Sequence, residues 1–388
     1  TNRFCHFMIP TTVNHPDAGL YIHIPFCASR CIYCGFYSTT LLPLRHQYTD
    51  ALCQEMELLP YKPRLATIYL GGGTPSQLSH EDLTQLFDHI YNKVYEVNAD
   101  AEVTMECNPD DIHHGMFSHL PVNRVSMGAQ TFSDERLRFL HRRHNAKEVE
   151  QAVDCLRQDG ITNISLDLMF GFPEETLSEW KSDVEHALSL QPEHISAYGL
   201  MYEEGTALYS MLQSGKVKEI DEELSLKMYD TLIDMLTAAG YEHYEISNFA
   251  RKDGQQRSPW RSRHNSSYWH DTPYIGLGAG AHSYYQRTRH WNPDNIKQYI
   301  DSISTGRLPY EEEKIDDNTH YDDIVTTALR TSEGIDLRCL TPPYRQYLIS
   351  CAKDYLRRGM LIEEDGHIRL TRQGINISNI IMSDLMHV

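Results

Sequence analysis

Three cysteines lie close together in the segment HIPFCASRCIYCGF, residues 23–36, with the spacing C-x3-C-x2-C. They are Cys27, Cys31 and Cys34. Cysteine thiolates bind zinc and iron–sulfur clusters, and both kinds of centre commonly take four protein ligands. Three ligands leave one coordination position open, and in catalytic zinc sites the open position binds the reacting molecule. The spacing therefore predicts a metal centre with a place for a small molecule.

The chemistry of such a centre depends on its metal. A 4Fe–4S cluster held by three thiolates has one iron that an amine and a carboxylate can chelate, and S-adenosylmethionine carries both groups. An electron passed from the cluster into the sulfonium would break a carbon–sulfur bond and leave a 5′-deoxyadenosyl radical. The alternatives are a zinc knuckle completed by a histidine such as His23, and cysteines without any ligand. The other six of the nine cysteines are mostly scattered singly along the chain. In a reducing compartment we expect most of them to be small buried hydrophobic residues.

Composition and charge narrow the class of protein. The chain has 388 residues, of which 40% are hydrophobic and 23% charged, and this predicts a soluble protein with more than one domain. A formal charge of −19 argues against wide contact with a nucleic-acid backbone, which needs a basic surface. The apolar runs fall short of the roughly 18 residues of a membrane span, and the first residues lack a signal-peptide pattern. We therefore expect a cytoplasmic protein with no nucleic-acid partner and no transmembrane segment.

A strand followed by a helix recurs six times in the first half of the chain. The predicted strands lie within residues 19–26, 66–76, 101–110, 122–132, 163–176 and 194–206. This order predicts a parallel sheet with helical crossovers, either open and doubly wound or curled into a full or partial barrel. Ligands of such folds bind beyond the carboxyl ends of the strands. The unusual residues gather at these ends, namely the three cysteines, GGGTP (71–75), Glu106, Asn108, Gln130, Asp167 and Tyr198.

Several residues at these strand ends have a chemical reason to be there. Three successive glycines, residues 71–73, allow a backbone to approach a ligand closely, whereas a plain turn does not need three. Asp167 stands between two leucines in an apolar strand, where a carboxylate is costly unless it is paired or bound. Glu106 is able to accept hydrogen bonds from ribose hydroxyls or an amine, and Arg142 to pair with a substrate carboxylate. A solvated position is the alternative for both.

The pattern changes in the second half of the chain. Residues 261–285 are rich in glycine, histidine and aromatic residues and are predicted to form loops. Helices are expected from residue 317, and the pair Asp365-Gly366 predicts a tight hairpin within residues 359–374. Helices followed by such a hairpin suggest a winged-helix-like domain. Because the charge around it is mixed, a packing or partner-binding role is favoured over DNA binding.

Together these motifs are similar to those of the radical S-adenosylmethionine superfamily, and within it the chain resembles the HemN/HemW family over nearly its whole length. The motifs are YIHIPFC, GGGTPS, E-x-N-P, SMGAQTF, DLMFGFPEET, EEGT, YEISNFA, GLGAGAHS and the C-terminal helices with their hairpin. The resemblance implies an α/β fold with a partial, TIM-like (β/α)6 barrel and a small helical, winged-helix-like C-terminal domain. The implied divisions are an N-terminal tail (1–18), the barrel (19–245), a barrel extension (246–310) and the C-terminal domain (311–388).

The resemblance also assigns residues to cofactors. The 4Fe–4S cluster would be held by Cys27, Cys31 and Cys34. S-adenosylmethionine would lie against Tyr21, Tyr33, Gly72 and Glu106. The positions that bind a second S-adenosylmethionine molecule in HemN-type enzymes are matched by Gly73, Thr74, Gln130, Arg142 and Asp167.

Three features separate the two branches of the family. HemN-type chains have a further cysteine two residues after the third, where this chain has Phe36, and a longer N-terminal extension before the first strand. The segment HNSSYW, residues 264–269, matches the H-N-x-x-Y-W motif of HemW-type proteins. Haem contact is thereby assigned to His264, Asn265, Tyr268 and Trp269. The imidazole is able to ligate haem iron and the aromatic rings to pack on a macrocycle, while a structural cluster of a histidine and aromatic rings is the alternative.

A HemW-like protein would bind the cluster, S-adenosylmethionine and haem, and would deliver haem to acceptor proteins such as respiratory cytochromes, with an electron-donor protein as a further partner. The alternative is an oxygen-independent coproporphyrinogen III oxidase of porphyrin biosynthesis, which forms protoporphyrinogen IX by oxidative decarboxylation. A radical enzyme with an unknown substrate is the third reading. A homodimer and a peripheral position at the inner face of the membrane are left open.

Overall fold

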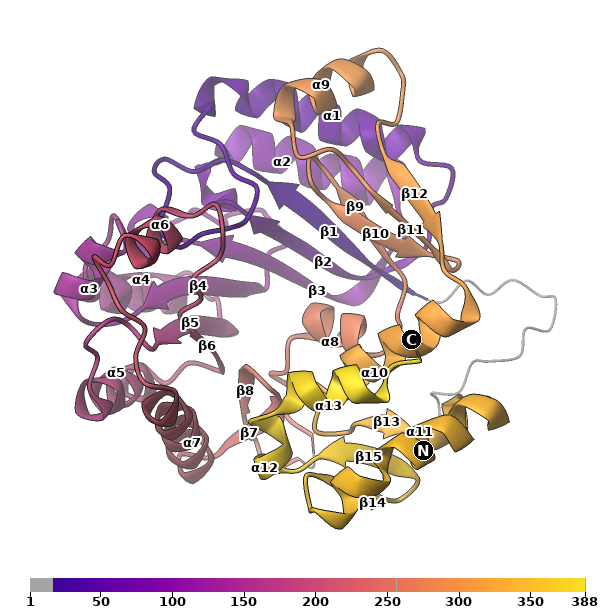
Figure 1. Cartoon of the computed structure of the whole chain (residues 1–388). Helices are drawn as coiled ribbons and strands as arrows, with labels where there is room; N and C mark the ends of the chain where they lie inside the picture. The colour runs from indigo at the N-terminus through magenta and orange to yellow at the C-terminus, as the bar shows by residue number, and fades with distance from the viewer. Residues whose placement is uncertain (1–16, 256, 388) are drawn as a thin grey trace.

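Six parallel strands form the centre of the computed structural model, which describes residues 17–255 and 257–387 (Figure 1). They stand side by side in chain order: β1 (Ala18–Ile24), β2 (Leu65–Gly72), β3 (Val97–Cys107), β4 (Arg124–Gln130), β5 (Ile164–Phe170) and β6 (His194–Gly199). Every neighbouring pair among them is parallel. The six predicted strands are therefore confirmed, and an α-helix follows each of them except β3, which is followed by a 3-10 turn and a loop before β4. Of the predicted N-terminal tail, residues 1–16 lie outside the described residues.

α-Helices lie in the connections between these strands, except from β3 to β4, and also follow β6. They are α1 (Arg45–Leu58), α2 (His80–His89), α3 (Asp134–Phe139), α4 (Ala146–Gln158), α5 (Leu177–Ser189), α6 (Ala207–Gln213) and α7 (Glu222–Ala238). Short 3-10 turns, including η4 (Pro109–Asp111), and one π turn lie between them. Ser79 begins α2 as expected, because its side chain accepts a hydrogen bond from Asp82 N and Asp82 reciprocates in a capping box.

The two faces of the sheet differ in polarity. On β1, Leu20, Ile22 and Ile24 are fully buried and join the large hydrophobic core shared with the outer helices. The alternate residues, Tyr21 and His23, point to the other face. Parallel strands that are buried on both faces usually read as continuous apolar runs, so polar residues along one face indicate an interior that binds or positions something.

Further strands extend the sheet at both edges. β9 (Tyr274–Leu277) pairs with β1 and is followed by β10 (His282–Tyr285), β11 (Thr288–Trp291) and β12 (Glu311–Lys314). At the other edge β6 pairs with β8 (Asn248–Arg251), which pairs with β7 (Tyr241–Glu245). The twelve strands of this sheet run in one linear order from β12 to β7, so they form an open, curved sheet, as a partial barrel requires.

The prediction of loops for residues 261–285 was wrong. HNSSYW belongs to α8 (Arg263–Trp269), and β9 and β10 follow it. Ser262 begins the helix, since its side chain accepts a hydrogen bond from Asn265 N. The helix is only seven residues long and its first turn is fixed by distant residues, which local periodicity does not reveal. In Figure 1, α8 lies on the concave side of the sheet, opposite α1 and α2.

A buried carboxylate attaches the C-terminal extension of the sheet to the first helix. Glu55 on α1 accepts hydrogen bonds from Gly278 N (2.8 Å), Asn292 Nδ2 (2.6 Å) and Tyr299 Oη (2.6 Å). Tyr299 belongs to α9 (Ile296–Ser304), which lies beside α1 in Figure 1. Burial raises the pKa of Glu55, and the three donors offset part of that cost.

The C-terminal residues have a hydrophobic cluster of their own. Its elements are α10 (Asp317–Ala328), β13 (Ile335–Asp336), α11 (Pro342–Arg357), β14 (Leu361–Glu364), β15 (His367–Leu370), α12 (Arg372–Ile375) and α13 (Ser378–Leu385). The predicted hairpin is confirmed, with Asp365 and Gly366 both at positive φ between β14 and β15. Arg372 connects this cluster to α7 through ion pairs with Asp230 and Asp234.

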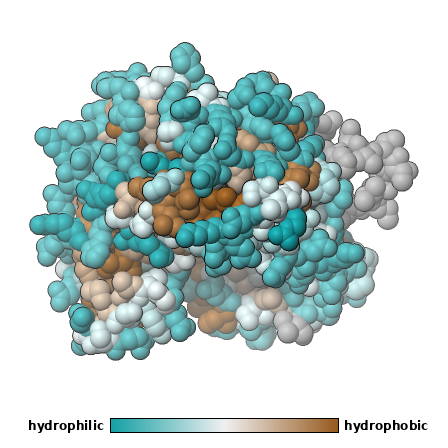
Figure 2. Space-filling view, turned by 90° about the horizontal axis from the view of Figure 1, so that it is seen from above, coloured by the Kyte–Doolittle hydropathy of each residue, from teal (hydrophilic) through white to brown (hydrophobic). Residues whose placement is uncertain are grey.

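The face of the molecule seen from above is mostly hydrophilic, with a hydrophobic area near its middle (Figure 2). Among the described helices, none is both long and apolar enough to cross a membrane.

Candidate cofactor and haem sites

The cysteine loop follows β1 at the carboxyl end of the sheet and is fixed by backbone contacts. Cys27 N donates to Thr39 O (2.9 Å), and Thr39 N donates to Pro25 O (2.7 Å). Further along the loop, Ile32 N donates to Leu140 O (3.3 Å) and the Ile32 side chain is buried. The loop therefore has a defined path that places three half-buried thiols beside the ends of the other strands.

The three sulfurs of the loop are not closed around one point. Tetrahedral Zn–S bonds of about 2.3 Å would bring thiolates to within about 3.8 Å of one another. Among the described residues, the sulfurs of Cys27, Cys31 and Cys34 do not all lie within 4.8 Å of one another. Burial raises the pKa of Cys27 and of Cys34, and metal binding would compensate for ionising them.

The glycines after β2 fit closely against the cysteine loop. A Cβ on Gly73 would lie 2.7 Å from the Pro25 carbonyl carbon and 2.9 Å from Phe26 O, so backbone would have to move. Gly72 has a φ of +108° and a Cβ there would meet the His23 ring. Gly73 is thus required by the close approach of two backbone segments, and Gly72 by its positive φ and the His23 ring, whether or not a ligand is present.

A chain of polar contacts joins two of the three cysteines. Thr74 Oγ1 lies 3.6 Å from Cys27 Sγ and accepts a hydrogen bond from Asn108 Nδ2 at 3.4 Å. Asn108 Oδ1 accepts from Arg142 Nη2 at 2.8 Å, and Arg142 Nη1 donates to Cys31 Sγ at 3.6 Å. Arg142 is therefore not a solvated helix arginine. Its positive charge faces a thiol that the cluster would need as a thiolate.

Two half-buried carboxylates, Glu106 and Asp167, and the buried Arg124 lie close to this chain of contacts. Glu106 accepts hydrogen bonds from Tyr69 Oη (2.7 Å) and Gly72 N (3.1 Å), and burial raises its pKa. Burial and the nearby Glu106 charge raise the pKa of Asp167 to about 7, although Arg124 opposes the shift. Asp167 thus changes protonation near neutral pH, which is typical of residues at functional sites.

The remaining residues assigned to S-adenosylmethionine surround the same strand ends. Tyr33 lies in the cysteine loop, and burial raises the pKa of its phenol. Gln130 ends β4 at a bulge with a φ of +67°, beside Arg142. Tyr21 donates or accepts a hydrogen bond with His23 Nδ1 at 2.9 Å and stacks on Tyr69. The structure therefore places Tyr33 and Gln130 beside the cysteines and Arg142, whereas Tyr21 also stacks on His264 of the HNSSYW segment at 6.5 Å.

The HNSSYW segment lies near the opposite end of the same face. His264 is 1% exposed, and its Nδ1 lies 2.8 Å from Thr67 Oγ1 on β2. Its Nε2 lies 2.8 Å from Tyr268 Oη, so both ring nitrogens are occupied by the protein. The ring also stacks on Tyr69 at 5.0 Å. Burial, with Arg124 as a second cause, lowers the pKa of His264 to about 3, which keeps the imidazole neutral at physiological pH.

The other residues of the segment surround the histidine differently. Tyr268 packs edge-to-face against Tyr274 at 4.6 Å. Trp269 carries the guanidinium of Arg330 over its ring at 4.9 Å, and its Nε1 is buried without a hydrogen-bond partner among the described residues. Asn265 N donates a hydrogen bond to Ser262 Oγ, which caps the start of the helix. In this structure the HNSSYW segment forms a compact aromatic cluster that is separate from the cysteine loop.

Two residues with a clear structural part did not emerge as candidates from the sequence. Glu102 on β3 accepts hydrogen bonds from the backbone N–H groups of Arg263 and His264, both at 2.9 Å, and so holds the start of α8. Arg124 is 1% exposed, and its charge acts on both Asp167 and His264. The argument applied to Asp167, that a charge in an apolar strand must be paired, would have found Arg124 as well.

Comparisons with known proteins agree with these features. A family model described as the radical SAM superfamily matches residues 21–187. Heme chaperone HemW of Bacillus subtilis (strain 168) is 37% identical over 373 residues, which cover 92% of this chain and 96% of that protein. Heme chaperone HemW of Synechocystis sp. is 34% identical, with 81% of this chain and 78% of that protein covered.

A solved structure shares the architecture. Coproporphyrinogen III oxidase (HemN) from Escherichia coli, described as a radical SAM enzyme, superposes with a TM-score of 0.81 over 96% of this chain and 90% of that chain. Its identity of 22% shows a common fold and no more. The similarity to HemW proteins extends over almost their whole length, well beyond the segment matched by the superfamily model. This chain belongs to the HemW family of radical S-adenosylmethionine proteins.

Proposed function

We propose that the chain binds haem and transfers it to acceptor proteins, as a haem chaperone of the HemW type. The relatives that are named heme chaperones match it over most of their length. The observation that carries the proposal is α8, which holds a neutral imidazole and two large aromatic rings within one short helix. Porphyrinogen decarboxylation is less favoured, because HemN shares only the fold and Phe36 stands where HemN-type chains have a further cysteine.

The carboxyl end of the sheet would hold the cofactors. The residues for a 4Fe–4S cluster are Cys27, Cys31 and Cys34. Those for S-adenosylmethionine are Tyr21, Tyr33, Gly72 and Glu106, and those for a second molecule are Gly73, Thr74, Gln130, Arg142 and Asp167. When bound, the cluster supplies an electron that S-adenosylmethionine accepts. The protein itself would keep the Cys31 thiolate beside the Arg142 guanidinium and would hold the pKa of Asp167 at about 7.

Haem ligation by His264 requires a local rearrangement. The Nε2 atom is hydrogen-bonded to Tyr268 Oη, and the iron would have to replace that partner. Since the pKa of His264 is about 3, no proton has to leave the ring between pH 5 and pH 8. Thr67 remains available to orient the ring through Nδ1, as outer partners of metal-bound histidines do.

A haem titration followed through the Soret band tests this proposal. We expect His264→Ala to bind haem at least tenfold more weakly and to shift the Soret band, while it keeps its iron–sulfur cluster. Tyr268→Phe removes the competing hydrogen bond and leaves the ring for packing, so haem should bind several-fold more tightly. A matched control is His290→Ala, which removes another buried histidine, on β11.

Unchanged haem affinity and an unchanged Soret band in His264→Ala would overturn the assignment of this residue. An anaerobic assay of the reconstituted protein with coproporphyrinogen III tests the alternative, and repeated turnover would favour an oxidase. The acceptors we propose are haem proteins such as respiratory cytochromes, with an electron-donor protein for the cluster and the cytoplasm as the place of transfer. Transfer from the loaded protein to an apocytochrome would support this part.

A further inference from the structure

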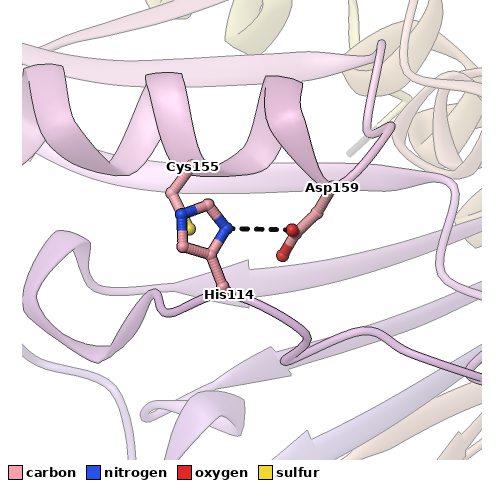
Figure 3. A group of neighbouring side chains, drawn as sticks. All are labelled: His114, Cys155 and Asp159. Carbon is pink, nitrogen blue, oxygen red and sulfur yellow. Dashed lines mark hydrogen bonds and ion pairs between the residues drawn. The ribbon is translucent and has the colours of Figure 1, made fainter.

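We propose that His114, Cys155 and Asp159 form a second metal site, selective for Zn²⁺, outside the cofactor end of the sheet. Cys155 lies in the last turn of α4, and Asp159 caps that helix one turn later. His114 lies in the loop after η4. One ligand atom from each residue lies within 4.8 Å of the other two (Figure 3). No other group of this kind occurs in the part of the chain that the structure describes.

The histidine and the carboxylate are already oriented toward each other. His114 Nδ1 lies 3.1 Å from Asp159 Oδ1, and Gly115 N donates to Asp159 Oδ2 at 2.8 Å. These bonds lower the pKa of Asp159, so the carboxylate is ionised and its direction is fixed. Figure 3 shows the imidazole of His114 and the sulfur of Cys155 side by side next to that carboxylate. The three side chains converge from one helix end and one loop.

The donor set identifies the metal. One thiolate, one imidazole and one carboxylate suit Zn²⁺, whereas Mg²⁺ and Ca²⁺ prefer oxygen ligands alone. Tetrahedral Zn²⁺ requires its ligands to lie about 3.3–3.8 Å apart, so rotations of an exposed histidine and a half-exposed cysteine would complete the site. Three protein ligands leave the fourth position to water. Burial and Asp159 raise the pKa of the Cys155 thiol, and Zn²⁺ binding would release its proton to solvent.

The site would connect two elements that the cofactor end depends on. The segment that carries His114 begins at Asn108, which contacts Thr74 and Arg142. It also contains Asp111, which accepts hydrogen bonds from Ser76 and Gln77. A metal ion between this segment and the end of α4 would restrain both. The proposal does not depend on haem binding or on the assigned function.

Cobalt(II) is the probe for this site, because a thiolate bound to Co²⁺ gives a charge-transfer band. The cluster cysteines would also bind it, so the full-length variant with Cys27, Cys31 and Cys34 replaced by Ala is the starting protein. We expect one Co²⁺ per chain with a sulfur-to-cobalt band, and displacement of Co²⁺ by a stoichiometric amount of Zn²⁺. Added Zn²⁺ should also raise the Tm of this protein.

Matched substitutions identify the residue that gives rise to the charge-transfer band. In the same background Cys155→Ser should abolish it, and His114→Asn should weaken Co²⁺ binding at least tenfold. Cys351→Ser, at a cysteine in the C-terminal cluster, should leave the band unchanged. Circular dichroism without metal verifies that each variant is folded. If Cys155→Ser is not folded, the Co²⁺ affinity of His114→Asn tests the proposal instead. A band that persists in Cys155→Ser, or no band at saturating Co²⁺, would overturn the proposal.

Discussion

Glu106 and Glu102 lie on the same strand, β3, and point to the same face of the sheet. Glu102 is buried and accepts two backbone N–H groups at the start of α8. Glu106 accepts one phenol and one backbone N–H beside the cysteine loop, and its pKa is raised. The first carboxylate is used by the protein to hold a helix in place. The second keeps an acceptor ready at the end where ligands of such sheets bind.

The same contrast holds for the other polar residues of the two ends. His264 has both ring nitrogens occupied by Thr67 and Tyr268. At the cofactor end, Arg142 Nε has no hydrogen-bond partner among the described residues, and Asp167 has a pKa of about 7. Where all hydrogen-bonding groups already have protein partners, some of these bonds must break before a ligand binds. Where a polar group lacks a partner or has a shifted pKa, a ligand is able to stabilise it directly. The four predictions below test this difference.

The largest effect is expected at the cluster. Replacing Cys31 by Ala removes one of three iron ligands and the partner of the Arg142 guanidinium, so anaerobic reconstitution should give no stable cluster. The wild type should contain about four irons and four sulfides per chain. Cys107→Ala is the control, because that thiol is buried in the hydrophobic core. Iron and sulfide analysis measures both, and full iron content in Cys31→Ala would refute the ligand assignment.

The next effect concerns the protonation of Asp167. Its folded pKa of about 7 lies above the ordinary value of 3.8, so the folded state binds the proton more tightly than the unfolded state. The stability that this contributes is present at low pH and is lost as pH rises toward 8. Asp167→Asn has no such loss. Relative to the wild type, its free energy of unfolding should therefore rise by up to about 4 kcal/mol between pH 4 and pH 8.

Urea unfolding at several pH values measures this difference. Asp88→Asn serves as the comparison, because Asp88 is an exposed residue on α2. A constant difference between Asp167→Asn and the wild type would mean that Asp167 is ionised throughout.

The smallest effect separates the two glutamates of β3. Glu102→Gln weakens two charge-assisted hydrogen bonds to α8 and should lower the free energy of unfolding by roughly 2 kcal/mol. Glu106→Gln removes a carboxylate that burial disfavours, so at neutral pH its stability should change by less than about 1 kcal/mol. Chemical denaturation measures both variants, and binding of S-adenosylmethionine should suffer only in Glu106→Gln. Equal stability losses would contradict the contrast between the ends.

The cofactor end was predictable from the sequence because unusual residues such as Asn108 directly follow apolar strands, and because Asp167 is a carboxylate between two leucines within β5. The HNSSYW end was not. The partners of His264 stand 197 residues away, at Thr67, and 162 residues away, at Glu102. No local pattern relates such residues, so a seven-residue helix fixed by them was read as a loop. Arg124 was also missed, although the argument applied to Asp167 would have found it as a charge in an apolar strand. What the sequence does not reveal is that its charge acts on Glu106 and Asp167 on the neighbouring strands.

The central claim is that one face of the sheet carries two separate sites, and haem titration of a protein without its cluster tests it most directly. The variant with Cys27, Cys31 and Cys34 replaced by Ala should bind haem within about twofold of the wild-type affinity, with the same Soret band. His264→Ala should conversely retain about four irons per chain. Loss of haem binding together with the three cysteines, in a variant that circular dichroism shows to be folded, would contradict the account.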